Sequence, residues 1–104
     1  MATSLVVAID KEAISVGSER VALVSDASAS PDMLIEPLAN RLNAARDQMD
    51  NIARLKGDGQ TASRLVTIQG DEDIEFRVLE KVMYTLDKTG FPDVALAVIK
   101  KAQG

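Results

Sequence analysis

The chain has 104 residues, of which 46% are hydrophobic and 27% are charged, a balance that suits one modest core and carries no signature of disorder. A net charge of −4, no Trp, one Tyr and two Phe leave little with which to neutralise phosphates or stack on bases, which argues against nucleic-acid binding. The absence of His and Cys excludes the usual zinc and copper sites, imidazole acid–base chemistry and the common catalytic triads.

The first quarter of the chain has the pattern of short strands. Leu5–Ile9 is apolar and rich in β-branched residues, and it ends at a polar turn. Residues 13–16 alternate apolar and polar side chains, residues 17–19 form a turn signal, and residues 21–24 are apolar again. We therefore expect one strand followed by a hairpin.

The next segment predicts one long amphipathic helix. Ser30–Asp32 offers a capping hydroxyl, a proline and an early carboxylate, whereas Pro37 would break a helix that had already begun. We therefore expect a separate first turn, with the main helix starting near Glu36 and ending at Gly57. Its apolar stripe runs every three or four residues through Ile35, Leu38, Leu42, Ala45, Met49, Ile52 and Leu55.

The second half of the chain has the pattern of a strand, a helix and another strand. A polar, glycine-bearing connector at residues 56–63 leads to the strand pattern Leu65–Ile68, which ends at Gly70. An acidic run precedes a second helix that Gly90 closes, and Val94–Ile99 is continuously apolar, which favours a central strand covered on both faces. The apolar face of the second helix consists of Ile74, Val78, Leu79, Val82, Met83 and Leu86.

These elements predict an α+β fold, a two-layer sandwich with one mixed sheet of four to five strands and two helices on one face, in the order β-β-α-β-α-β. Residues 70–93 would form a crossover between parallel strands, and residues 1–104 would form a single domain. If the last strand is central, Leu96→Ala should cost about 2–5 kcal/mol. The longest apolar run is far shorter than the ~20 residues that span a bilayer, and the start has no basic-then-apolar leader.

Several short motifs have simpler structural interpretations than chemical ones. The acidic run Asp71–Asp73 could bind a metal or act as acid and base, but negative charge before a helix is favoured by its unpaired N–H groups. The segment Lys56–Gln60 lacks the lysine and hydroxyl of a nucleotide loop, and Ser25, Ser28 and Ser30 have no base to activate them. We therefore predict no catalytic residue, no metal site and no cofactor.

The apolar surfaces suggest assembly. Met33, Met49 and Met83 could line a partner groove, although stripes at helical spacing usually face their own sheet, and we expect these methionines in the core. The edges of a small sheet have unpaired N–H and C=O groups that can pair with a second copy or with an extended peptide. Dimerisation through a sheet edge is therefore physically easy.

Residues Val66–Val98 resemble the C-terminal half of ExbD/TolR proteins. In that family a strand leads into Ala-Asp, an apolar residue and an aromatic residue follow two positions apart, and a helix with Val-Met-Asp and Leu ends at Ala-Gly before a last apolar strand. The positions that match here are Asp71, Ile74, Phe76, Val82, Met83, Leu86, Gly90 and, as the core position of the last strand, Leu96. This chain departs from the pattern at Gly70, Tyr84 and Thr89, where the family has Ala, Asp and Ala.

The resemblance implies a non-enzymatic periplasmic domain, tethered to the inner membrane of a Gram-negative bacterium by a preceding transmembrane helix with an ionisable aspartate. It would couple a proton-driven motor to the periplasm. The implied partners are a second copy, a proton-channel subunit like ExbB or TolQ, a rod like TonB or TolA and, in TolR-like members, peptidoglycan. The alternatives are a free-standing periplasmic module that binds cell wall or peptide, and an enzyme built on Asp71 and its neighbouring carboxylates.

Overall fold

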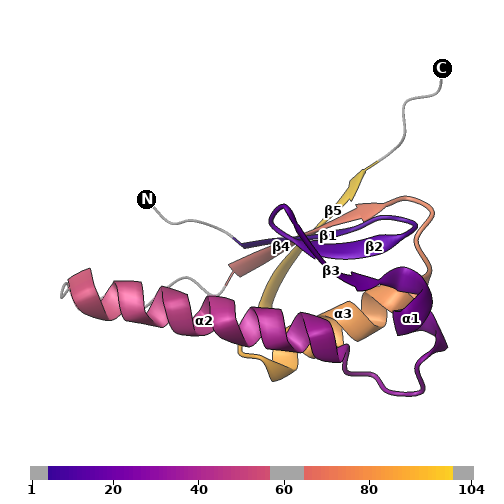
Figure 1. Cartoon of the computed structure of the whole chain (residues 1–104). Coiled ribbons are helices and arrows are strands. Elements are labelled where there is room, and N and C mark those ends of the chain that lie inside the picture. Colours follow the sequence, from indigo (N-terminus) through magenta and orange to yellow (C-terminus); the bar gives the residue numbers. More distant parts are fainter. Residues whose placement is uncertain (1–4, 57–64, 100–104) are drawn as a thin grey trace.

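The computed structural model describes residues 5–56 and 65–99, which form one mixed β-sheet with helices packed beneath it (Figure 1). The predicted α+β class is confirmed. The predicted hairpin forms two separate strands, and the structure adds a short first helix to the predicted order. The elements are β1 (Leu5–Ile9), β2 (Ala13–Val16), β3 (Glu19–Leu23), α1 (Val24–Ala29), α2 (Glu36–Lys56), β4 (Leu65–Asp71), α3 (Phe76–Lys88) and β5 (Asp93–Ile99).

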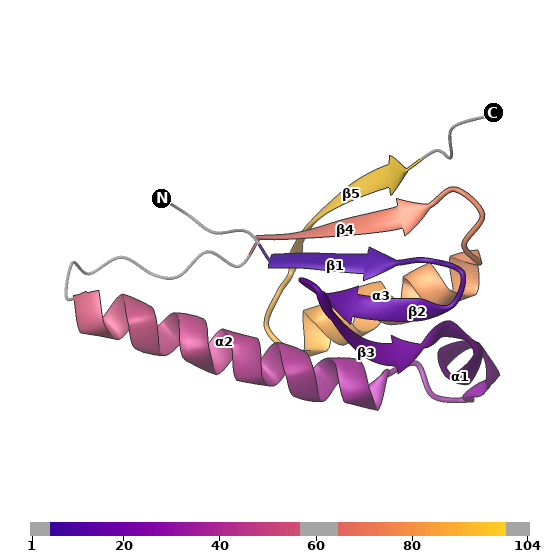
Figure 2. The ribbon, with the colours of Figure 1, turned by 45° about the horizontal axis from the view of Figure 1, so that its top comes forward.

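The sheet combines an antiparallel half with a parallel half, in the strand order β3-β2-β1-β4-β5 (Figure 2). The hairpin strands β1, β2 and β3 pair antiparallel, while β4 pairs parallel to β1 on one side and to β5 on the other. Strands β1, β2 and β3 are antiparallel because tight turns between them reverse the chain. Strands β1, β4 and β5 are parallel because helical crossovers connect them. The two edges of the sheet are therefore β3 and β5.

Strand alternation directs one apolar face toward the helices. Val7 pairs with Val16 of β2 and with Ile68 of β4, and all three side chains are buried. Each such aliphatic side chain contributes roughly 1.5–3 kcal/mol when it is fully buried. The core also includes Ile9, Ile14 and Val66 from the sheet, Leu38 and Leu42 from α2, and Val78, Val82 and Leu86 from α3.

The segment before α2 differs from the prediction. Residues 24–29 form α1, which the sequence interpretation did not predict, and Ala27 of this helix packs into the core. Ser30 does not begin a helix, since its Oγ accepts the Asp32 N–H at 3.1 Å within a turn. Met33, expected in the core, is 42% exposed in the same segment.

Helix α2 begins at Glu36, as expected from the position of Pro37. Its first half follows the predicted stripe, with Leu38 and Leu42 fully buried. Its second half extends beyond the sheet, so Ile52 is 48% exposed and Leu55 is 86% exposed. The predicted helix stop at Gly57 and most of the predicted connector lie outside the described residues. No helix within residues 5–56 and 65–99 has both the length and the apolar character needed to cross a bilayer.

The turn between β1 and β2 is held by one carboxylate. Oδ1 of Asp10 accepts the N–H groups of Glu12 and Ala13, each at 2.7 Å. The N–H groups of Ala13 and Glu12 hold the pKa of Asp10 below its ordinary value of 3.8, because they stabilise the ionised carboxylate. Asp10 is therefore more acidic in the folded chain than in the unfolded chain.

We expect Asp10→Asn to destabilise the fold at neutral pH, with a difference that shrinks in acid. A depressed pKa contributes stability above the unfolded-state value, and this contribution is lost as the pH falls through the folded-state value. Urea unfolding of both chains between neutral pH and about pH 2 measures the difference in the free energy of unfolding. A difference that stays constant over this pH range would show that the charge of Asp10 contributes nothing.

Candidate functional site

The acidic run forms the turn between β4 and α3. Oδ1 of Asp71 accepts the Asp73 N–H at 2.9 Å, and the Asp71 carbonyl accepts the Ile74 N–H at 3.1 Å. Helix α3 begins only at Phe76 and has no acidic residue in its first turn, so the expectation that the run caps this helix is wrong. Asp73 instead forms an exposed ion pair with Lys11 at 3.7 Å. Asp71 thus shapes a turn, and in the described part of the chain no three acidic groups come together to hold a metal ion.

Gly70 and Ile74 fit together across this turn. A Cβ atom on Gly70 would lie 2.9 Å from Cδ1 of Ile74, closer than side chains normally pack. The isoleucine therefore occupies the space that an alanine methyl group would need. An alanine here, the residue of the resembling family, would require the flexible end of the Ile74 side chain to move.

Gly90 ends α3 by adopting a backbone conformation that favours glycine, with φ of 93°. The Gly90 N–H is 3.4 Å from the Asp87 carbonyl, and the Phe91 N–H donates to the Leu86 carbonyl at 2.9 Å. This is a Schellman-type helix end, in which Leu86 and Phe91 also meet as a buried apolar pair. Gly90 is therefore a helix-stop residue, as the sequence predicted.

Phe76 and Met83 do not enter the core. Phe76 is 71% exposed and Met83 is 44% exposed, so the assignment of Met83 to the buried helix face is wrong. Both lie on the same flank of α3 as Leu79, at helical spacing. The opposite flank carries Lys81 and Thr85, which are buried.

The placement of Leu96 corrects the prediction for the last strand. β5 is an edge strand, and of its residues only Val94 is partly buried. Leu96 pairs with buried Ile68 of β4, so it projects toward the helix layer, yet it is 52% exposed. The reason is that α2 and α3 pack beneath the other strands and leave β5 uncovered.

We group these exposed apolar positions under the name β5–α3 surface, which we define as Phe76, Met83, Leu96 and Val98. Lys81 and Thr85 bind α1 and the Ile35 backbone, and α1 contacts β3 and β2. Phe76 and Met83 lie on the other flank of α3 and are exposed. Val98 is 58% exposed on the same sheet face as Leu96. Unpaired edge strands and exposed apolar side chains are each typical of interaction surfaces.

We expect Leu96→Ala to change the free energy of unfolding by less than about 1 kcal/mol, because the side chain is already half in water. Thermal unfolding of the dilute chain measures this, since dilution removes any contribution from self-association. A cost of 2 kcal/mol or more, the lower end of about 2–5 kcal/mol for a buried leucine, would restore the central placement of β5.

Two buried residues were missed by the sequence interpretation. Phe91 is fully buried, and its position directly after a helix-ending glycine was the available signal. Lys81 is only 4% exposed, and its ammonium donates to the Ala27 carbonyl at 2.8 Å and to the Ser30 carbonyl at 2.6 Å. Nothing in the sequence pattern indicates that a lysine joins α3 to the end of α1.

We expect Lys81→Met to destabilise the chain by about 1–3 kcal/mol, because it leaves the two buried carbonyls without their donor. Lys88→Met on the same helix is the matched control, since Lys88 is exposed and its ammonium lies 5.4 Å from the centre of the Tyr84 ring. Urea unfolding compares the two variants. Equal losses would mean that the Lys81 hydrogen bonds do not hold α1.

Comparison with known proteins adds no relative, since no family model and no curated protein matches this chain.

Proposed function

We propose that this chain is the periplasmic domain of an ExbD/TolR-type protein, a non-enzymatic accessory of a proton-driven motor in the inner membrane of a Gram-negative bacterium. One observation carries the proposal. Of the eight positions that match in the resemblance, Val82 and Leu86 are buried, whereas the apolar residues Phe76, Met83 and Leu96 are exposed. A purely structural role would place such residues in the core, so their exposure favours a role in assembly.

The domain works as a dimer that pairs through β5. This strand is a sheet edge of seven residues, with apolar side chains on both of its faces. Antiparallel pairing with a second β5 would satisfy the free backbone groups of both edges and continue one sheet into the other. It would also place the exposed Leu96 and Val98 side chains of the two copies next to one another.

The modest free energy of this β5 pairing would allow the membrane part to control binding in the periplasm. State changes in the membrane part, made of the transmembrane helix and a channel subunit like ExbB or TolQ, would favour or disfavour the paired edges. The exposed surfaces would in turn bind or release a periplasmic rod like TonB or TolA or, in TolR-like members, peptidoglycan. A switch of this kind needs two arrangements of similar free energy, which an edge strand at a modest interface provides.

Photo-cross-linking in cells tests the proposal. A photoreactive amino acid replaces Leu96 in the full-length protein within its native membrane, and the covalent dimer is quantified with and without a protonophore. We expect a dimer whose yield changes severalfold when the proton gradient collapses. The control position is Leu55, which is 86% exposed on α2 and far from β5.

Two outcomes would overturn the proposal. Absence of a covalent dimer at position 96 would exclude pairing through β5. A dimer whose yield ignores the proton gradient, together with binding of purified peptidoglycan sacculi, would replace the motor accessory with a free-standing cell-wall-binding module.

A further inference from the structure

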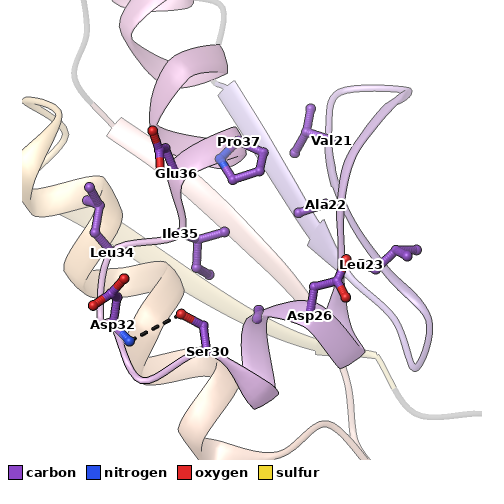
Figure 3. A pocket seen from close by; sticks show the side chains of 11 residues that line it. Val21, Ala22, Leu23, Asp26, Ser30, Asp32, Leu34, Ile35, Glu36 and Pro37 are labelled. Carbon is purple, nitrogen blue, oxygen red and sulfur yellow. Dashed lines mark hydrogen bonds between the residues drawn. The ribbon is translucent and has the colours of Figure 1, made fainter.

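The β3 edge of the sheet, opposite β5, lies beside acidic as well as apolar side chains. A cavity of about 330 Å³ lies beside β3, between this strand, α1 and the segment that leads into α2 (Figure 3). Val21, Ala22 and Leu23 line it from the strand, and Ile35 and Pro37 line it from across the cavity. The sheet edge itself thus forms one wall of an apolar hollow.

Three carboxylates from three different segments surround this hollow. Asp26 comes from α1, Asp32 from the loop after it, and Glu36 from the start of α2. No Lys or Arg among the described residues lines the cavity, and none of the three carboxylates forms an ion pair within the described part of the chain. Lys81 lies behind the wall, where its ammonium is already bound to the carbonyls of Ala27 and Ser30.

The positions of two of these carboxylates also suit the helices. Asp26 and Glu36 lie in the first turns of α1 and α2, where negative charge is favoured. Asp32 lies in neither helix, and the helix dipole does not explain why all three side chains surround one apolar hollow. An apolar wall with a carboxylate rim suits an amphipathic cation, since a lysine or arginine packs its aliphatic stem on apolar surface and keeps its charge at the rim.

The backbone of β3 could bind the main chain of a peptide, beside the cavity that would bind one of its side chains. No described strand lies beyond β3, and Leu23 at its end is 47% exposed. An extended peptide can pair with such an edge, and its side chains then alternate between the two faces of the sheet. One side chain of an added strand would enter the cavity next to Val21–Leu23.

We propose that the β3 edge and its cavity bind an extended segment of a partner protein, with a Lys or Arg side chain in the cavity. The inference rests on the proposed function and deepens it, because it separates the edge used for self-pairing, β5, from the edge used for the partner, β3. The apolar side chains of β5 suit a second copy, whereas the acidic rim beside β3 disfavours one, since this chain has a net charge of −4.

Titration with two capped peptides of about seven residues tests this inference. Both alternate Thr and Val, one with a central Lys and the other with a central Glu, and backbone amide NMR shifts of the purified chain are recorded up to millimolar peptide. We expect the Lys peptide to shift the amides of Val21–Leu23 and to bind about tenfold or more tightly than the Glu peptide, because the three carboxylates attract an ammonium group and repel a carboxylate.

Variants that neutralise the three carboxylates around the cavity test whether their charge selects the Lys peptide. The triple variant Asp26→Asn, Asp32→Asn and Glu36→Gln should remove the preference for the Lys peptide. A control triple variant of exposed carboxylates on and before α3, Glu72→Gln, Glu80→Gln and Asp87→Asn, should keep it. All six substitutions are on the surface, and amide spectra without peptide check that each fold is intact.

Equal binding of the two peptides, an absence of shifts at Val21–Leu23, or an equal loss in both triple variants would overturn the inference. Such a result together with gradient-sensitive cross-links at position 96 would overturn the β3 site alone and leave the proposed function standing. Cross-links at position 96 that do not respond to the proton gradient, together with Lys-dependent shifts at Val21–Leu23, would overturn the proposed function and leave the β3 site standing.

Discussion

Leu96→Lys should convert the proposed dimer into a monomer without unfolding the chain. Leu96 is the central residue of β5 and is 52% exposed, so a lysine there can extend into water in the monomer at little cost. In an antiparallel pair formed about the strand centre, the two lysines would face each other across an apolar interface. Burial of like charges is costly, and a lysine on an edge strand is a common natural device against pairing.

We expect the dimer dissociation constant to rise at least about 100-fold, which corresponds to about 2.7 kcal/mol. Sedimentation over a range of concentrations measures it, and circular dichroism checks the fold. Leu55→Lys is the control, because Leu55 is an exposed leucine on the extended end of α2. If Leu55→Lys disrupts the dimer and Leu96→Lys does not, the interface lies along α2. A parent chain that stays monomeric at millimolar concentration contradicts self-pairing altogether.

Phe91→Ala should destabilise the monomer by about 3–5 kcal/mol, a large share of the roughly 5–15 kcal/mol that holds a typical domain. The Phe91 side chain is fully buried and packs into the core cluster beside Leu86, at the point where α3 turns into β5. Removing the ring leaves a cavity at the helix end and removes the apolar pair of the Schellman motif.

Phe76→Ala is the matched control, with the same change of side chain at the other end of the same helix. Phe76 is 71% exposed, so its loss should change the free energy of unfolding by no more than about 0.5 kcal/mol. Urea unfolding of both variants measures the difference between them. Similar costs would contradict the placement of Phe91 in the core, whereas a dimer weakened by Phe76→Ala alone would support the β5–α3 surface.

Most of the elements could be predicted because their signals are local. Pro37 and Gly90 mark a helix start and a helix end through backbone restrictions that act within a few residues. The alternation in the first strands and the apolar stripe at Val78, Val82 and Leu86 reflect which side of each element is buried. The misplaced helix start at Ser30 is also local, because its hydroxyl serves a turn as readily as a helix cap.

The candidate site was harder to predict because it depends on what covers each element. A continuous apolar strand such as β5 has the same sequence whether helices bury it or a second protein does. The same holds for the stripe of α2, which continues through Ile52 and Leu55 past the end of the sheet. Local pattern shows that a side chain is apolar, but only the docking of the helices decides whether it enters the core of its own chain.

By itself, the sequence determined the α+β class, the alternation of strands and crossover helices, and the absence of imidazole and thiol chemistry. Tertiary structure decided that β5 is an edge, that Phe91 rather than Leu96 is a core anchor, and that Lys81 joins α3 to α1. It also brought Asp26, Asp32 and Glu36 around one hollow. Such features depend on contacts between distant segments, and the periodicity of a single segment carries no information about them.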